Sequence, residues 1–137
     1  MNASQALAEW IIDQAADAII YADREGRIVR WNQAACQIFG FSQQEALGAS
    51  LDLIIPERLR DAHWAGYHAA LTAGQMKLAG KPTLTRGVHQ SGRKLYVEMT
   101  FALVKDDAGQ AIGSVAVARD VTEKVEQERA ARVAQNS

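Results

Sequence analysis

The segment from Lys94 to Val104 constrains the fold most, because its large apolar residues recur at every second position. Side chains alternate between the two faces of a β-strand, so one face is shared by Leu95, Val97, Met99, Phe101 and Leu103. An apolar face of this kind is stable only when another layer covers it. The chain must therefore build a sheet and pack other elements against one side of it.

Four further segments have the composition of strands: residues 18–22, 28–31, 83–89 and 112–119. Turn sequences rich in Gly, Asp and Ser separate neighbouring strands at residues 23–26, 90–93 and 106–109. Tight turns of this length join antiparallel strands, whereas parallel strands need long crossovers. The sequence therefore predicts a five-stranded antiparallel sheet.

An amphipathic helix is predicted over residues 4–14, ahead of the first strand, with Ser4 as its N-cap. Its apolar side presents Leu7, Trp10 and Ile11. This helix precedes the core, so an apolar side on it is available to another molecule. We expect these three residues to form a contact with a second copy of the chain, in a homodimer.

Two short helices are predicted after the second strand, one over residues 32–38 and one that begins with the capping box Ser-Gln-Gln-Glu at residues 42–45. After the last strand the chain becomes a charged helix, and Asp-Val-Thr-Glu at residues 120–123 predicts a second capping box. We expect a flanking helix over residues 1–16, a core over residues 17–120, and a helix that links to an output partner over residues 121–137.

A longer helix is predicted between Pro56 and Gly74, and its apolar side contains a histidine. Helical spacing places on one side Leu59, Ala62, His63, Gly66, Tyr67, Ala70 and Leu71. His63 therefore points toward the core. An unsatisfied buried polar group costs roughly 1 to 3 kcal/mol, so we expect His63 to have a hydrogen-bond partner or a ligand.

Composition excludes several classes of function. The chain has 137 residues, 48% of them apolar, and a net charge of −1, which gives no basic surface for nucleic acid. No apolar run approaches the roughly 20 residues of a membrane span, and the start lacks the pattern of a signal peptide. The single cysteine, Cys36, fits a reducing compartment. We expect a cytoplasmic domain without a nucleic-acid or membrane partner.

Five short motifs, taken together, resemble those of PAS sensory domains between about residues 15 and 125. They are Ala-Ile-Ile-Tyr-Ala-Asp at 18–23, Gly-Arg-Ile-Val-Arg-Trp-Asn-Gln-Ala-Ala at 26–35, Ile-Phe-Gly-Phe at 38–41, Glu-Ala-Leu-Gly at 45–48 and Arg-Asp-Val-Thr-Glu at 119–123. The resemblance implies an α+β PAS fold. In that fold short helices and one longer helix cover one face of a five-stranded antiparallel sheet, with flanking N- and C-terminal helices, and a ligand sits between the sheet and the long helix.

A closer resemblance surrounds His63. The segment Leu-Ile-Ile-Pro-Glu-Arg-Leu-Arg-Asp-Ala-His at 53–63 is similar to haem-binding PAS gas and redox sensors, in which the histidine is the proximal iron ligand. The resemblance implies that haem b is held by His63, with Met99 and Phe101 on the distal side. The other expected pocket residues are Ile55, Tyr67, Leu84, Val97, Val115 and Val117.

The chain departs from the oxygen sensors of this group on the distal side. Those sensors have an arginine that donates to bound gas where this chain has Thr83, and a redox-sensing relative has methionine where it has Lys81. We therefore expect carbon monoxide, nitric oxide or redox state, rather than stably bound oxygen, as the signal. Arg119 and Asp120, at the end of the last strand, are expected to relay the signal to the C-terminal helix.

Two alternatives explain the same residues. Histidine at this helix position also occurs in PAS domains with no known haem, so a module that has no cofactor or binds a small metabolite, and acts through dimerisation, is one alternative. Noncovalent flavin is the other, although the Asn-Cys-x-x-Leu-Gln stretch of flavin light sensors is missing and Cys36 is expected to be a small buried residue. In each case the output partner, such as a kinase or regulator, is separate or removed. Without a catalytic motif, we expect no enzymatic activity.

Overall fold

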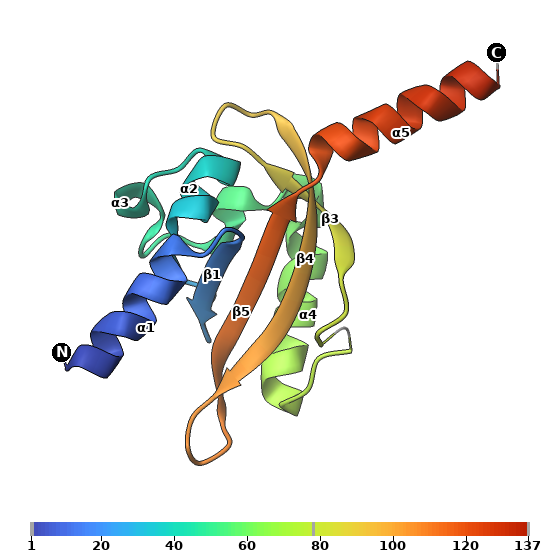
Figure 1. The fold of residues 1–137 in the computed structure, drawn as a ribbon. Coiled ribbons are helices and arrows are strands. Elements are labelled where there is room, and N and C mark those ends of the chain that lie inside the picture. Colours follow the sequence, from blue (N-terminus) through green and yellow to red (C-terminus); the bar gives the residue numbers. More distant parts are fainter. Residues whose placement is uncertain (1, 78, 137) are drawn as a thin grey trace.

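The computed structural model describes residues 2–77 and 79–136 (Figure 1). Its helices are α1 (Ala3–Gln14), α2 (Gln33–Phe39), α3 (Gln43–Ala46), α4 (Arg60–Ala73) and α5 (Thr122–Gln135), with two 3-10 helices, η1 (Leu51–Ile54) and η2 (Glu57–Leu59), before α4. The strands are β1 (Ala18–Asp23), β2 (Ile28–Trp31), β3 (Thr83–Val88), β4 (Lys94–Lys105) and β5 (Ala111–Asp120). Among these residues no helix is both long and apolar enough to cross a membrane.

All five strands join one antiparallel sheet in the order β2-β1-β5-β4-β3, which confirms the predicted sheet. In the central β4–β5 hairpin, Ala118 lies opposite Met99, and Ala116 lies opposite Phe101. Side chains alternate along a strand, so the even-numbered residues of β5 share a face with the odd-numbered residues of β4. This register decides which side chains reach the space between the sheet and α4.

The helices α2 and α4 cover one face of the sheet, whereas no helix lies over the centre of the opposite face (Figure 1). The core between the layers is apolar, and the rings of Trp31 and Phe39 lie 5.6 Å apart within it. Cys36, which was expected to be a small buried residue, is half-buried and packs against this core. The arrangement confirms the predicted α+β architecture.

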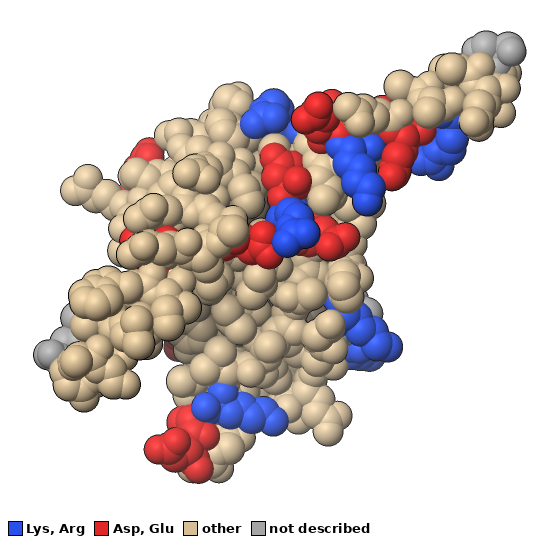
Figure 2. All heavy atoms as spheres, in the orientation of Figure 1, with Lys and Arg blue, Asp and Glu red and all other residues tan. Residues whose placement is uncertain are grey.

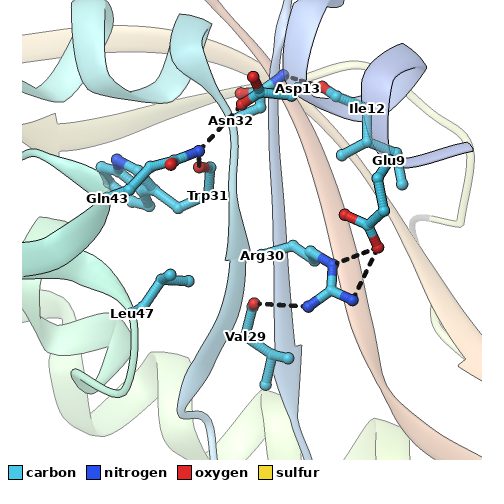
Figure 3. Close-up of a pocket in the computed structure, with 9 residues that line it drawn as sticks. All are labelled: Glu9, Ile12, Asp13, Val29, Arg30, Trp31, Asn32, Gln43 and Leu47. Carbon is cyan, nitrogen blue, oxygen red and sulfur yellow. Dashed lines mark hydrogen bonds and ion pairs between the residues drawn. The ribbon is translucent and has the colours of Figure 1, made fainter. Parts of the chain in front are cut away.

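Polar contacts attach α1 to β2 and α3 (Figure 3). Two guanidinium nitrogens of Arg30 donate to one carboxylate oxygen of Glu9, at 3.2 and 2.9 Å. The side-chain amide of Gln43 donates to Asp13 at 3.0 Å. A small pocket of about 200 Å³ lies between these contacts. Because α1 has no fully buried residue, polar contacts rather than a shared core fix its position.

The N-cap of α1 is Asn2, so the prediction of Ser4 is wrong. The Asn2 side chain accepts a hydrogen bond from the backbone N–H of Gln5 at 2.8 Å, and the Gln5 side chain accepts from the backbone N–H of Asn2 at 3.0 Å. This reciprocal pair satisfies two backbone donors, whereas a cap at Ser4 would satisfy one with its own side chain. The helix therefore begins earlier than the sequence predicted.

The start of α5 also differs from the prediction. Its N-cap residue is Val121, whose side chain makes no capping hydrogen bond, and Glu123 does not complete a capping box. Instead, Asp120 accepts from the backbone N–H of Thr122 at 2.9 Å. Thr122 is buried against β4, so its burial rather than a reciprocal cap sets where α5 begins. From that point α5 projects away from the sheet (Figure 1).

Candidate ligand-binding cavity

A cavity of about 920 Å³ lies between α4 and the sheet, at the place where a ligand was predicted. Its volume falls within the roughly 300 to 1,000 Å³ that small-molecule and cofactor sites occupy. Residues from β1, β3, β4, β5, α4, the two 3-10 helices and the loop after α4 form its walls. Most of these residues are apolar or small, as ligand sites generally require.

Small side chains on α4 produce much of this space. The predicted apolar side of the helix faces the cavity, and six of its seven residues line it: Leu59, Ala62, His63, Gly66, Tyr67 and Ala70. A Cβ atom added to Gly66 would meet nothing within 4 Å. Glycine inside a helix costs roughly 1 kcal/mol relative to alanine, and here it leaves the helix backbone open to whatever enters the cavity.

The sheet contributes Met99 and Phe101, as predicted, but not Val115 and Val117. These valines lie opposite Ala102 and Thr100, so they belong to the other face of the sheet, and their prediction is wrong. Their neighbours Ser114 and Ala116 line the cavity instead. The strand therefore turns its small residues toward the cavity.

Three other predicted wall residues have different outcomes. Ile55 lines the cavity from the segment before α4. Leu84 also borders it, from the edge strand β3, but Leu84 pairs with Glu98, so its side chain belongs to the other face of the sheet, and the residue is 57% exposed. Val97 points to the correct face but is fully buried in the core and does not line the cavity, so that prediction is wrong. Gly87, which packs on Val97 and Phe39, takes its place in the wall.

Other lining residues were not predicted from the sequence: Ile20, Ala22, Leu51, Ile54, Ala69, Ala73, Gln75, Met76, Lys77, Thr85, Arg86, Gly87, Ser114 and Ala116. For Met76 a signal was present. Gly74 ends α4 in the left-handed conformation with a φ of 70°, and an apolar residue soon after such a cap often packs back on the helix. The small residues of β1 and β5 gave no comparable signal, because alanine and serine are common on either face of a strand.

The His63 side chain faces the cavity, as its place on the apolar side of the helix predicted, and the expected hydrogen-bond partner is not found at Nδ1 within the part of the chain that the structure describes. Its Nδ1 atom is buried and has no hydrogen-bond partner among the described residues. The centre of its ring lies 4.7 Å from that of Trp64 and 5.7 Å from that of Tyr67. Burial lowers the pKa of His63, and the nearby carboxylate of Asp52 opposes that shift only in part. The imidazole is therefore neutral at neutral pH, which is the form that binds metals.

Polar contacts hold the segment around His63 in place. The indole N–H of Trp64 donates to Asp52 at 2.8 Å, and Arg60 donates to the backbone carbonyls of Ile55 and Asp52 at 3.1 and 3.2 Å. The Tyr67 hydroxyl donates to the backbone carbonyls of Ala22 and Asp23, which ties α4 to the end of β1. Together these bonds fix the position of His63 relative to the sheet.

Thr83, which differs from the oxygen sensors, and Lys81, which differs from a redox-sensing relative, are not among the described residues of the cavity wall. The hydroxyl of Thr83 donates to the backbone carbonyl of Lys81 at 3.2 Å. Basic residues in the wall are Lys77, which is exposed, and Arg86, which packs on a tyrosine of the opposite sheet face. The guanidinium of Arg86 therefore lies on the other side of the sheet from His63 and Met99.

The two predicted relay residues lie where the sheet meets both flanking helices. Arg119 pairs with Asp17 through two contacts of 3.2 Å, which join the end of β5 to the segment between α1 and β1. Asp120 accepts hydrogen bonds from Thr122 at the start of α5. Their contacts connect the sheet to α1 and α5, and their part in signalling stays a prediction.

Comparison with known proteins identifies the family. The sequence model of the PAS fold matches residues 8–121, which is most of the chain. An uncharacterized protein of Azorhizobium caulinodans is 28% identical over 128 residues, covering 93% of this chain and 17% of that protein. The oxygen sensor protein DosP of Escherichia coli is 23% identical over 131 residues, covering 96% of this chain and 16% of that protein. The chain thus spans about a sixth of the length of these curated relatives.

Solved structures agree with this assignment. The PAS domain of a Colwellia psychrerythraea protein superposes with a TM-score of 0.75 at 19% identity, covering 88% of this chain and 98% of that one. An RNA-binding light-oxygen-voltage receptor superposes with a TM-score of 0.74 at 21% identity, covering 100% of this chain and 39% of that one. At these identities the structures support the fold and no particular ligand. The chain belongs to the PAS fold family and is a signal-sensing domain.

Proposed function

We propose that the domain binds haem b in the cavity, with His63 as an iron ligand, and senses a gas or redox state. The observation that carries this proposal concerns the ring of His63, which lines a large apolar cavity. Its Nδ1 atom is buried and has no hydrogen-bond partner among the described residues. A neutral imidazole in a cavity wall is able to bind iron through its other ring nitrogen, Nε2, and a ligand that binds the folded chain stabilises it. Haem supplies an iron that binds small gases and changes oxidation state.

The other residues of the cavity suit a flat, largely apolar ring. Ala62, Gly66 and Ala70 leave space along α4, and Met99 and Phe101 form an apolar wall on the sheet. The described residues contain no cluster of three or more His, Cys, Asp or Glu side chains able to hold a bare metal ion. A porphyrin supplies most ligands of its own iron, so it needs one or two from the protein. Met99 is suited to close the distal side, or to offer its thioether.

Flavin fits these walls less well than haem. An isoalloxazine ring has several hydrogen-bond donors and acceptors, which side-chain amides commonly satisfy. Gln75 is the amide side chain among the described lining residues, and it is exposed in the loop after α4. The hydroxyls of Thr85 and Tyr67 already donate to backbone carbonyls. Light-oxygen-voltage proteins share the fold at 14 to 21% identity, and that likeness carries no flavin assignment for this chain.

Haemin titration of the purified chain tests the proposal. We expect a sharp Soret band that saturates at one haem per chain. Gly66→Leu is the matched control, because it fills the cavity while His63 and Met99 are unchanged. Leucine favours a helix over glycine by up to about 1 kcal/mol, so this variant is expected to fold and to bind haemin at least tenfold more weakly. The proposal fails if the wild type gives no sharp band, or if both proteins titrate alike.

Homodimerisation through α1 is a second candidate function, compatible with the first. The side chains of Leu7, Trp10 and Ile11 are 54%, 59% and 61% exposed. Figure 2 shows that charged residues are sparse over α1 and the middle of the open sheet face, and gather near the start of α5. Exposed apolar side chains next to an uncharged surface are typical of an interface between proteins.

Sedimentation equilibrium measures this second candidate. We expect the wild-type chain to dimerise and Trp10→Glu to weaken the dimer by at least tenfold in Kd, because the change buries a charge in an apolar contact. Ala8→Glu adds the same charge to the flank of the helix and serves as the control. Equal dissociation constants for the wild type and Trp10→Glu would place the interface elsewhere.

A further inference from the structure

Two arginines approach the ring of Tyr96, on the sheet face opposite the cavity. Arg86 of β3 is paired with Tyr96 in the register of the sheet, and its guanidinium carbon lies 4.4 Å from the ring centroid. The guanidinium carbon of Arg129, on α5, lies 4.9 Å from the same centroid. A cation within about 6 Å of an aromatic face is attracted by the quadrupole of the ring. The ring of Tyr96 therefore joins β3 to α5.

The low exposure of Tyr96 agrees with two arginine side chains that lie over its ring. No helix covers the centre of this sheet face, yet Tyr96 is only 9% exposed. The stems of long basic side chains can cover an aromatic ring while their charged ends stay in water. Arg86 and Arg129 are both exposed residues whose charged ends lie over this ring. Loss of either one would uncover part of the ring.

The backbone of Tyr96 holds the first turn of α5. Its N–H donates to the Thr122 hydroxyl at 2.9 Å, and its carbonyl accepts from the N–H of Val121 at 2.9 Å. The Thr122 hydroxyl in turn donates to Asp120 at 2.6 Å. These bonds fix where α5 begins. Arg129 lies almost two helical turns after Thr122. Its contact with the Tyr96 ring therefore holds α5 in one direction relative to the sheet.

Arg86 connects the ring contact to the cavity. Arg86 and its neighbours Thr85 and Gly87 are among the residues that line the cavity wall on β3. This strand is at the edge of the sheet and pairs only with β4. An edge strand has a ladder on one side alone, so it moves more easily than a central strand. The strand β3 thus contributes both to the cavity wall and to the contact with the ring of Tyr96.

We infer that Arg86, Tyr96 and Arg129 form a clamp that couples the cavity wall at β3 to the direction of α5. The role of this clamp in signalling rests on the proposed ligand site. The contacts that form the clamp are present in the folded chain without a ligand. Displacement of β3 loosens Arg86 from the ring, frees the ring, and weakens the hold on Arg129. The helix that leads out of the domain then moves about its fixed first turn.

Amide hydrogen exchange of the full chain without haem, followed by NMR, tests the clamp. An exposed cation–π contact changes a local opening equilibrium by about two- to fivefold. We therefore expect Arg86→Gln, a change in β3, to speed exchange in α5 around residue 129 by that factor. Arg129→Gln should do the same, and the double variant should add little, because both changes act through one ring. Tyr96→Phe keeps the ring and should exchange like the wild type.

Arg132→Gln is the matched control, since it removes the same charge one turn further along α5. The clamp is refuted if Arg86→Gln leaves exchange in α5 at the wild-type rate, or if Arg132→Gln speeds it equally. Unchanged exchange in β1 and β5 verifies that each variant is folded. Because no haem is present, these outcomes are independent of the proposed function, which fails separately if haemin does not bind.

Discussion

His63→Gly is expected to abolish the Soret band that haemin gives with the wild-type chain. Loss of a residue that merely supports a metal ligand costs roughly 10- to 100-fold in affinity, so loss of the ligand itself should cost more. Glycine leaves a gap the size of the imidazole beside the cavity. Free imidazole in the buffer should enter that gap and restore the band, because the neutral ring binds iron without its link to the helix. Absorption spectra at increasing imidazole concentration measure the rescue.

The control for this result is His68→Gly, on the same helix. His68 is exposed and its ring stacks on Trp64 at 5.9 Å between centroids, outside the described cavity lining. The change introduces the same helix-breaking residue, with a similar cost of somewhat under 1 kcal/mol, but leaves the cavity intact. This variant should keep the wild-type Soret band. If both variants keep it, His63 is not the iron ligand; if both lose it, the helix rather than the ligand is responsible.

The predictions of the fold were correct where a local sequence pattern and the observed burial of its residues agree. The alternation in β4 predicted a strand with one buried face, and Leu95, Val97 and Met99 are buried as expected. The capping box at Ser42 and the end of α2 at Gly40 are also present. These signals involve residues within a few positions of one another, so a single sequence contains all the information that they need.

The cavity wall on β5 was misread for a physical reason. Valine normally turns toward the core and alanine is tolerated outside, so Val115 and Val117 were expected to face the ligand. The register with β4 instead turns Ala116 and Ser114 toward the cavity. A wall that leaves space for a ligand needs small side chains, which reverses the usual preference. Sequence periodicity alone does not distinguish a filled core from a lined cavity.

Contacts between distant segments were also beyond a single sequence. The ring of Tyr96 contacts Arg129 of α5, and the Asp17 carboxylate, just before β1, contacts Arg119 on the neighbouring strand β5. Neither pair has the short sequence spacing of residues that contact each other within one helix or one hairpin. His63 differs, because the helical pattern predicted its direction from neighbouring residues alone. The sequence could therefore nominate the candidate ligand but not the residues that connect it to α5.

Asn32→Ala is expected to destabilise the fold by about 4 kcal/mol or more, which lowers Tm by about 10 °C or more. The Asn32 side chain is 1% exposed and makes four hydrogen bonds to backbone groups. Its oxygen accepts from Ile19 at 2.9 Å and from Ala35 at 3.1 Å. Its amide donates to Ile12 at 2.8 Å and to Asp17 at 3.0 Å. Alanine removes all four partners from buried or half-buried groups, at roughly 1 to 3 kcal/mol for each group left unsatisfied.

Thermal and urea unfolding, followed by circular dichroism, measure this loss against two controls. Gln33→Ala removes one exposed hydrogen bond to Asp13 at the next position, and should change stability by less than about 0.5 kcal/mol. Asn32→Ser keeps an oxygen that can cap α2 at Ala35 but is too short for the other three bonds, so it should recover only about 1 kcal/mol. A loss below 1 kcal/mol for Asn32→Ala would mean that water replaces the amide. The four bonds join α1, β1 and α2 around one side chain, so a full loss would show that Asn32 contributes more to the stability of this junction than the exposed polar contacts around it.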